Sequence, residues 1–302
     1  MSQNNYRAHK TVGFVGLGMM GSRMVRHLKG HANILIFDVD SARAKQSASE
    51  ANGHAVASMS EMSKADTVIM MLPNSKIVDS VVRGEPGKPG LIDILTPGAM
   101  IIDMSSATPA NTIENAKLAR AKGLIYMDAP VSGGPGGAES AKLAIMVGAS
   151  QSDFDHAKPL LDHMGTNVIL AGGTGSGHAV KALNNLLSAT ILAATSEVFA
   201  AGEKFGLDPH VMQKIVNASS GTSYATNHTW PGAILPKTYN FGFALALMHK
   251  DVGIAMSLIE STGIKTVLAK ASAGMWDQAL KNAATGADMT DITRQIQKEA
   301  GL

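Results

Sequence analysis

The sequence predicts a doubly wound α/β domain with a mostly parallel sheet, followed by an all-helical C-terminal domain. Short apolar runs of strand length alternate with longer, more polar segments through the first half of the chain. A glycine-rich segment follows the first run, and long apolar stretches with few strand-like runs fill the chain after about residue 167. We therefore expect one domain over residues 1–172 and a second over residues 173–302.

Length and composition are those of an ordinary globular protein. The 302 residues suggest two domains, at about 100 to 200 residues per domain. Apolar residues make up 45%, charged residues 17%, and the formal charge is +2. This balance disfavours both a disordered chain and a broadly basic nucleic-acid surface. The absence of cysteine excludes disulfides, thiol catalysis and cysteine-ligated metal sites, and it fits a reducing compartment. We expect a cytoplasmic location and no metal site.

The chain carries no predicted targeting or membrane segment. The N-terminus is polar and weakly basic and is followed by glycine-rich sequence, which is not the pattern of a secretory signal. The most apolar long window, residues 186–201, is shorter than the ~20 residues needed to span a bilayer. We expect a soluble protein without membrane or nucleic-acid partners.

Five apolar runs predict the strands of the sheet. They lack strict alternation, which suits strands covered on both faces, and the helical segments between them imply right-handed crossovers. The runs are residues 11–15, 34–37, 67–72, 99–104 and 142–147.

The segment GFVGLGMMG predicts a dinucleotide-binding loop of the Rossmann type. Gly16, Gly18 and Gly21 fit G-x-G-x-x-G directly after a predicted strand and before a helical segment. The first glycine permits a tight turn, the second lets the backbone approach a pyrophosphate, and the third lets the helix pack against the strand. The predicted cofactor-binding residues of this loop are Gly16, Leu17, Gly18, Met19, Met20 and Gly21.

Asp38, at the end of the second predicted strand, completes the dinucleotide site. It lies 22 residues after Gly16, where a carboxylate can accept hydrogen bonds from the adenosine ribose. A carboxylate there would repel the 2′-phosphate of NADP, so NAD is favoured. Arg43 lies five residues further on and could reach a 2′-phosphate, although we expect it to be a solvated surface residue.

The segment DAPVSGGPGG, residues 128–137, predicts a carboxylate-binding loop. Ser132, Gly133 and Gly134 offer a hydroxyl and two unshielded backbone N–H groups. The alternative is an ordinary flexible turn, because glycine and serine dominate those as well.

A long helix is predicted over residues 177–204, with a length of roughly 40 Å. The residues expected to form its core stripe are Val180, Leu183, Leu187, Ile191, Ala194 and Val198. A polar stripe formed by Lys181, Asn184, Asn185 and Ser188 lies at i, i+3, i+4 and i+7, on a single face.

Lys181 is the predicted acid/base of this helix. It lies near the helix N-terminus, where the dipole disfavours a cation, and it has an amide one turn further on. Such a lysine can take a proton from an alcohol or return one to an alkoxide, while the amide of Asn185 fixes the geometry. The alternative is a solvated lysine tail. His178 lies on a different helical face, and we expect it to be a capping or surface residue.

These motifs together resemble the β-hydroxyacid dehydrogenase family. The segments GFVGLGMMG, MLPN, DMSSATP, DAPVSGG, GxGxxxKxxNN and KDVGIA occur in the family's order, and the resemblance covers residues 12–271. It implies an NAD(P)-binding Rossmann domain, an all-helical C-terminal domain, and the reversible oxidation of a 3-hydroxy carboxylate, such as 3-hydroxyisobutyrate, to its semialdehyde.

The resemblance also assigns site residues. Lys181 matches the catalytic lysine and Asn185 the substrate-orienting asparagine, and residues 132–134 match the carboxylate-binding loop. The other matches are Leu72, Pro73, Ile77, Ser106 and Lys250 toward the cofactor, and Phe243 toward the substrate. Without the resemblance, Lys250 would be an exposed helical lysine paired with Asp251. Many members have Gly-Thr where this chain has Ala141 and Lys142.

Two other functions compete with this hypothesis. One is a reductase of another small semialdehyde, such as tartronate semialdehyde, within the same family. The other is a non-catalytic dinucleotide-binding scaffold on the same fold, which the presence of both Lys181 and Asn185 disfavours. We also expect a homodimer or homotetramer, because a long apolar helix in a domain of about 130 residues leaves nonpolar surface uncovered.

Overall fold

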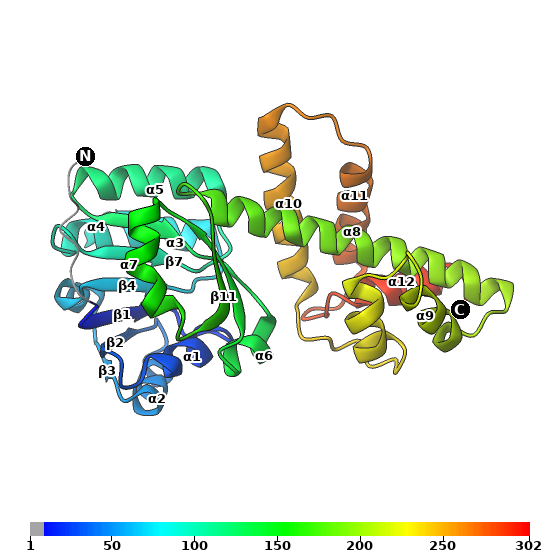
Figure 1. Ribbon diagram of the computed structural model, residues 1–302, viewed down its shortest axis with the longest axis horizontal. Coiled ribbons are helices and arrows are strands. Elements are labelled where there is room, and N and C mark those ends of the chain that lie inside the picture. The colour runs from blue at the N-terminus through cyan, green and yellow to red at the C-terminus, as the bar shows by residue number, and fades with distance from the viewer. Residues whose placement is uncertain (1–8) are drawn as a thin grey trace. The chain divides into compact units, whose positions relative to one another are not determined.

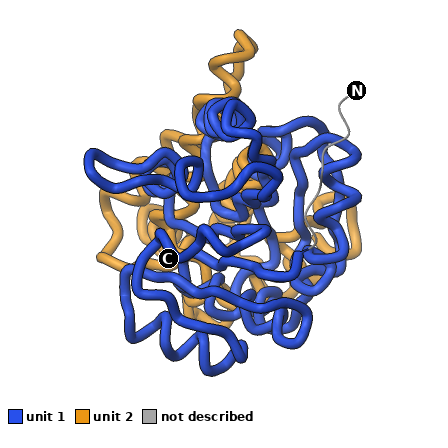
Figure 2. Tube along the Cα trace, turned by 90° about the vertical axis from the view of Figure 1, so that its left-hand side faces the viewer, with its two compact units in different colours: residues 1–181 blue, residues 182–302 orange. Residues whose placement is uncertain are grey.

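The computed structural model describes residues 9–302 of the chain (Figure 1). Most of the N-terminal segment, for which the sequence predicts no signal peptide, lies outside the described residues. The chain divides into two compact units, Met1–Lys181 and Ala182–Leu302, which Figure 2 colours separately.

Within the described residues, nine strands of the first unit form one sheet in the order β11-β10-β8-β7-β4-β1-β2-β3, with β9 beside β10. The strands from β3 to β8 along this order pair in parallel, as do β10 and β11. The mostly parallel sheet predicted from the sequence is confirmed. The strands are β1 (Thr11–Val15), β2 (Asn33–Phe37), β3 (His54–Ala55), β4 (Thr67–Met70), β7 (Met100–Asp103), β8 (Ile125–Asp128), β9 (Val131–Ser132), β10 (Leu143–Gly148) and β11 (Gly165–Gly172), with a separate hairpin of β5 (Gly84–Glu85) and β6 (Lys88–Pro89).

All five predicted apolar runs form strands, namely β1, β2, β4, β7 and β10. The strands of this sheet that were not predicted are β3, β8, β9 and β11. Of these, β11 is the longest. It lies at one edge of the sheet, and its residues after Gly165 are half-buried or exposed. An edge strand of this kind has no need for the continuous apolar run that marks a strand buried on both faces.

Helices cover both faces of the sheet. One hydrophobic cluster joins α1, η1, α2 and α7 to one face, and a second joins η2, α3, α4 and α5 to the other. This arrangement is the doubly wound architecture expected from the alternating pattern. The helices of this unit are α1 (Gly21–Met24), η1 (Val25–Leu28), α2 (Ser41–Ala51), η2 (Met59–Lys64), α3 (Ser75–Arg83), α4 (Leu91–Ile94), α5 (Pro109–Ala121), α6 (Gly134–Glu139) and α7 (Gln151–Leu161).

The second unit is helical, as predicted, and is built on the long helix α8 (Ser176–Phe205). Its core gathers around Phe199, Trp230 and Trp276. The remaining helices are α9 (Pro209–Asn217), the π-helix η3 (Ala225–Ile234), α10 (Leu245–Thr262), α11 (Leu268–Asn282) and α12 (Asp291–Glu299). Within residues 9–302, no helix is both long enough and apolar enough to cross a membrane.

The predicted core stripe of α8 is wrong. Leu187 and Val198, which were expected inside, are 61% and 60% exposed, and the buried side instead carries Leu186 and Ala189. The exposed members of the predicted stripe are Val180, Leu183, Leu187, Ala194 and Val198, whereas Ile191 is half-buried. Apolar residues lie on most sides of this helix, so periodicity alone could not select the face that packs against the rest of the chain.

Candidate active site

The glycine loop between β1 and α1 has the backbone geometry that a dinucleotide requires. Gly16 has a φ of +92°, and a side chain there would collide with the carbonyl of Met71. A side chain at Gly21 would collide with the carbonyl of Gly16, whereas nothing lies within 4 Å of the position that a Cβ at Gly18 would take. The turn and the close packing thus need glycine, and the open side of Gly18 leaves room for a pyrophosphate. The loop fits a nicotinamide dinucleotide.

The carboxylate of Asp38 holds this loop in place. Its Oδ2 accepts a hydrogen bond from Leu17 N at 2.7 Å, and its Oδ1 accepts one from Asp40 N at 2.9 Å. The guanidinium of Arg43 lies 3.6 Å from Oδ1 and 3.5 Å from the carboxylate of Asp40. Arg43 is therefore an ion-paired residue beside Asp38, at the edge of the dinucleotide loop.

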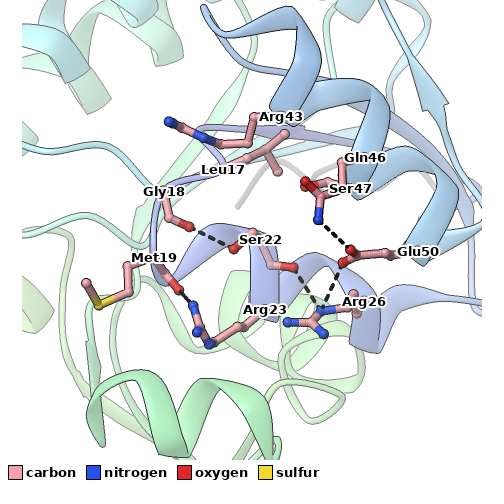
Figure 3. A pocket seen from close by; sticks show the side chains of 10 residues that line it. All are labelled: Leu17, Gly18, Met19, Ser22, Arg23, Arg26, Arg43, Gln46, Ser47 and Glu50. Carbon is pink, nitrogen blue, oxygen red and sulfur yellow. Dashed lines mark hydrogen bonds and ion pairs between the residues drawn. The ribbon is translucent and has the colours of Figure 1, made fainter. Parts of the chain in front are cut away.

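A polar hollow of about 420 Å³ borders the glycine loop on the side of α1 and α2 (Figure 3). Its arginines already have acidic partners, because Arg26 lies 3.6 Å from Glu50 and both Arg23 and Arg26 contact Glu139. The lining residues are Leu17, Gly18, Met19, Ser22, Arg23, Arg26, Arg43, Gln46, Ser47 and Glu50.

The remaining cofactor residues predicted in this unit follow the neighbouring strands. Leu72 and Pro73 come after β4, Ile77 lies in the first turn of α3, and Ser106 comes after β7. Strands β1, β4 and β7 are adjacent and parallel, so their carboxyl ends share one edge with the glycine loop. A hydrogen bond joins the loop after β4 to the loop after β7, because Leu72 N donates to the Ser105 hydroxyl at 2.9 Å.

The predicted carboxylate loop joins β9 to α6. Ser132 is the last residue of β9, and Gly133 and Gly134 have φ values of +126° and +60°, which favour glycine. Nothing lies within 4 Å of the position that a Cβ at Gly134 would take. Ala141, where many family members have glycine, also has a positive φ, of +54°. The chain thus keeps the left-handed turn at that position with a residue that pays a small steric cost.

Lys181 and Asn185 lie one turn apart on α8 and are both buried, with 9% and 6% of their surface exposed. This is not the environment of a solvated lysine tail. Asn185 Nδ2 donates to Asp251 Oδ2 at 2.6 Å, and the other oxygen of this buried carboxylate lies 3.2 Å from Lys250 Nζ. Asp251 on α10 therefore joins two residues that the sequence assigned to the site.

The predicted site residues are distributed over the two units. The first unit holds the glycine loop, Asp38, the loops after β4 and β7, the 132–134 loop and Lys181. The second unit holds Asn185, Lys250 and Phe243. The backbone N–H of Phe243 donates to Asp288 Oδ2 at 3.0 Å. Helix α8 is continuous through Lys181 and Asn185.

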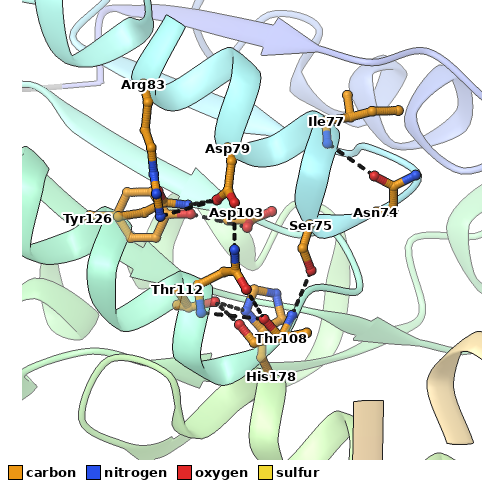
Figure 4. A network of polar contacts seen from close by, with 12 residues as sticks. Asn74, Ser75, Ile77, Asp79, Arg83, Asp103, Thr108, Thr112, Tyr126 and His178 are labelled. Atoms are coloured by element: carbon orange, nitrogen blue, oxygen red, sulfur yellow. Dashed lines mark hydrogen bonds and ion pairs between the residues drawn. The ribbon is translucent and has the colours of Figure 1, made fainter. Parts of the chain in front are cut away.

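A buried polar network beside Lys181 was missed by the sequence interpretation. Asp128 and His178 are both buried, so His178 is not the surface residue that the sequence suggested. Burial raises the pKa of Asp128, while hydrogen bonds from Gly175 N–H and His178 N–H act in the opposite direction. Figure 4 shows His178 beside Thr112, within a wider set of contacts that reaches Asp79 and Arg83.

The fold and the glycine loop define a dinucleotide-binding protein. Residues 11–173 match the family described as the NAD binding domain of 6-phosphogluconate dehydrogenase. Residues 175–296 match the one described as NAD-binding of NADP-dependent 3-hydroxyisobutyrate dehydrogenase.

Individual relatives agree with these matches. The chain is 39% identical to 2-(hydroxymethyl)glutarate dehydrogenase of Eubacterium barkeri, over 81% of this chain and 81% of that protein. It is also 39% identical to the mitochondrial 3-hydroxyisobutyrate dehydrogenase of Homo sapiens, over 84% of this chain and 77% of the relative. The solved 3-hydroxyisobutyrate dehydrogenase of Mycobacterium tuberculosis, described with L-serine, has a TM-score of 0.86 and 30% identity and covers 95% of this chain and 99% of its own.

The chain belongs to the β-hydroxyacid dehydrogenase family. It is an oxidoreductase that uses a nicotinamide dinucleotide and acts on the CH–OH group of a hydroxy acid. The sequence-based predictions of the family, the enzyme class and the cofactor class are thus confirmed.

Proposed function

We propose that the enzyme oxidises a 3-hydroxy carboxylic acid of the 3-hydroxyisobutyrate type to its semialdehyde, with NAD as the oxidant. The observation that carries this proposal is the buried Lys181, held one turn from a buried Asn185 at the start of a long helix. Among its relatives, the M. tuberculosis enzyme was solved with L-serine, which is itself a 3-hydroxy acid.

The substrate residues divide the work between binding and proton transfer. The Ser132 hydroxyl, with the backbone of Gly133 and Gly134, holds the carboxylate. Lys181 Nζ takes the proton from the 3-hydroxyl during oxidation and returns it during reduction, and the amide of Asn185 orients the same hydroxyl. A substrate anchored by its carboxylate presents its β-carbon for reaction, so a 2-hydroxy acid would present the wrong carbon.

The cofactor residues hold the dinucleotide along the carboxyl edge of the sheet. The glycine loop, residues 16–21, receives the pyrophosphate, and Asp38 accepts hydrogen bonds from the ribose and disfavours a 2′-phosphate. Leu72, Pro73, Ile77 and Ser106 line the same edge, and Lys250 acts at the nicotinamide end. When bound, the nicotinamide supplies the hydride acceptor.

The substituent at the α-carbon is the open feature of the substrate. Both 3-hydroxyisobutyrate and 2-(hydroxymethyl)glutarate carry a hydroxymethyl group on that carbon, and they differ in having a methyl or a carboxyethyl group beside it. The chain is equally identical to a relative named for each of these two compounds, so the substrate is best tested with a panel of hydroxy acids. A semialdehyde reductase of the tartronate type would use the same residues in the reverse direction.

The test is a substrate panel with purified enzyme. NAD or NADP is supplied with 3-hydroxyisobutyrate, 2-(hydroxymethyl)glutarate, L-serine, lactate as a 2-hydroxy acid, and methyl 3-hydroxyisobutyrate, and the absorbance of the reduced nicotinamide is followed. Turnover of a free 3-hydroxy acid, with little of lactate or the ester, is expected. Equal turnover of acid and ester would contradict the carboxylate loop, and turnover of lactate alone would contradict the proposed reaction.

We also infer that the enzyme is a homo-oligomer. The side chains of Leu187, Val198 and their neighbours form an exposed apolar stripe along α8, and apolar patches of this kind are typical of protein interfaces. A second copy of the chain is the proposed partner. The cytoplasmic location stays a prediction, and mammalian relatives are named as mitochondrial.

A further inference from the structure

The first turn of α8 is held by a buried carboxylate from another element. Asp128, the last residue of β8, accepts hydrogen bonds from Gly175 N at 2.6 Å and from His178 N at 2.7 Å. The first N–H groups of a helix have no partner within the helix, and a nearby side chain usually caps them. Here the capping carboxylate comes from a residue 47 to 50 positions earlier in the chain.

Two glycines make room for this carboxylate. A side chain at Gly148 would collide with the carboxylate of Asp128, and a Cβ at Gly177 would lie 2.8 Å from its Oδ2. Asp128 itself has no exposed surface. The carboxylate is thus enclosed on the sheet side by β10 and on the helix side by α8, and it has little freedom to move.

The imidazole of His178 ties the same turn to the cofactor edge of the sheet. Its Nε2 lies 2.9 Å from the carbonyl oxygen of Ser105, which only accepts hydrogen bonds, so Nε2 carries a proton. Its Nδ1 lies 2.7 Å from the hydroxyl of Thr112 on α5. The hydroxyl of Ser105 in turn accepts the N–H of Leu72. The ring therefore connects α8 to the loops after β7 and β4.

Lys181 follows His178 by three residues, which is less than one helical turn. Because this short stretch of helix is stiff, any shift of the anchored turn also shifts the lysine. A displacement of about 1 Å at a reacting group can cost about 10²-fold in rate. We propose that Asp128 and His178 are positioning residues for Lys181, which fix the proton-transferring lysine relative to the cofactor loops. This inference rests on the proposed role of Lys181.

A purely structural role would have a different signature. A residue that only stabilises the fold lowers the melting temperature but leaves kcat of the folded enzyme unchanged. A positioning residue lowers kcat while the KM for the cofactor, whose glycine loop and Asp38 make no hydrogen bond to Asp128 or His178, stays close to wild type.

The first test is Asp128→Asn, which keeps the shape but places an amide N–H₂ against a backbone N–H. We expect kcat to fall by about 10²-fold, with the KM for NAD within about twofold of wild type. The matched control is Asp66→Asn, because Asp66 also accepts a backbone N–H, from Thr11 at 3.0 Å, at the start of β1. This control should keep kcat, and circular dichroism checks the fold of both variants.

The second test compares His178→Gln with His178→Ala. Glutamine retains an N–H donor for the Ser105 carbonyl and an acceptor for Thr112, so we expect it to keep most of the wild-type kcat. Alanine removes both contacts, and we expect a loss of about tenfold or more. Equal kcat in the two variants would overturn the proposal, and this comparison decides the matter if Asp128→Asn does not fold.

Lys181→Ala, measured beside these variants, separates the two hypotheses. If Lys181→Ala is inactive while Asp128→Asn and His178→Ala keep wild-type kcat, the positioning role is wrong and the proposed function stands. If Lys181→Ala itself keeps wild-type kcat, the proposed function fails first.

Discussion

Replacing Asp38 with asparagine should weaken NAD binding and relax the discrimination against NADP at the same time. The carboxylate accepts hydrogen bonds from Leu17 N at 2.7 Å and Asp40 N at 2.9 Å, so it fixes the glycine loop to the end of β2. An asparagine side chain has only one oxygen. One of these N–H groups would then face an amide N–H₂, and the negative charge would be lost.

The two effects have different sizes for the two cofactors. A lost hydrogen bond to a charged group is worth about 1.5 to 3 kcal/mol, so the dissociation constant of either cofactor should rise by about 10- to 150-fold. For NADP this loss is opposed by relief of charge repulsion, which is about 4 kcal/mol for two unit charges about 4 Å apart at an effective dielectric constant of about 20. The guanidinium of Arg43 is 47% exposed and lies 3.6 Å from the Asp38 carboxylate, so it already offsets part of this charge repulsion. We expect the NAD-to-NADP ratio of kcat/KM to fall by about 10²-fold.

Steady-state kinetics with both cofactors test this expectation. The matched control is Asp40→Asn, since Asp40 also lies near Arg43, at 3.5 Å, but is an exposed cap of α2. An unchanged ratio in Asp38→Asn, or an equal change in Asp40→Asn, would refute the reasoning, as would a wild-type enzyme with the higher kcat/KM for NADP.

Three further predictions concern the substrate loop, the apolar stripe and the half-buried His9. Ser132→Ala should lower kcat/KM for the hydroxy acid by roughly 10- to 150-fold, because it removes a hydrogen bond to a carboxylate, whereas Ser140→Ala at the end of α6 should not. Leu187→Glu should shift the oligomer toward the 31.4 kDa monomer in light scattering, and Ser152→Glu, at an exposed position of α7 in the first unit, should not. Burial lowers the pKa of His9, so its neutral form stabilises the fold above the ordinary value of 6.5 and this stability is lost as the pH falls below it. The unfolding free energy of His9→Gln should therefore depend less on pH than that of wild type, and a parallel dependence would contradict this.

The sequence predicted the parts of the fold that depend on local pattern. Strands buried on both faces leave apolar runs, and the glycine loop leaves residues that no other type can replace, as the collisions at Gly16 and Gly21 demonstrate. The long helix was predicted over residues 177–204 and is found at Ser176–Phe205, because glycines lie before its start and Gly206 follows its end.

The parts that were missed depend on contacts between distant residues. The prediction of the buried side of α8 was wrong because apolar residues lie on several sides of the helix, and only packing against the other helices of the C-terminal core selects one side. The network of Asp128 and His178 joins residues 47 to 73 positions apart, and no local spacing signals it. A buried aspartate at a strand end and a histidine before the lysine were visible in the sequence, but their partners were not.

The most direct test of the proposed chemistry is the Lys181→Ala variant, measured with NAD and the best 3-hydroxy acid of the panel. We expect kcat to fall by about 10²- to 10⁴-fold, because a positioned proton acceptor is lost, while the dissociation constant of NAD changes little. Lys204→Ala, at the far end of the same helix, is the matched control and should retain wild-type kcat. A Lys181→Ala enzyme that keeps more than about half of the wild-type kcat would contradict the assignment of Lys181 as the acid/base.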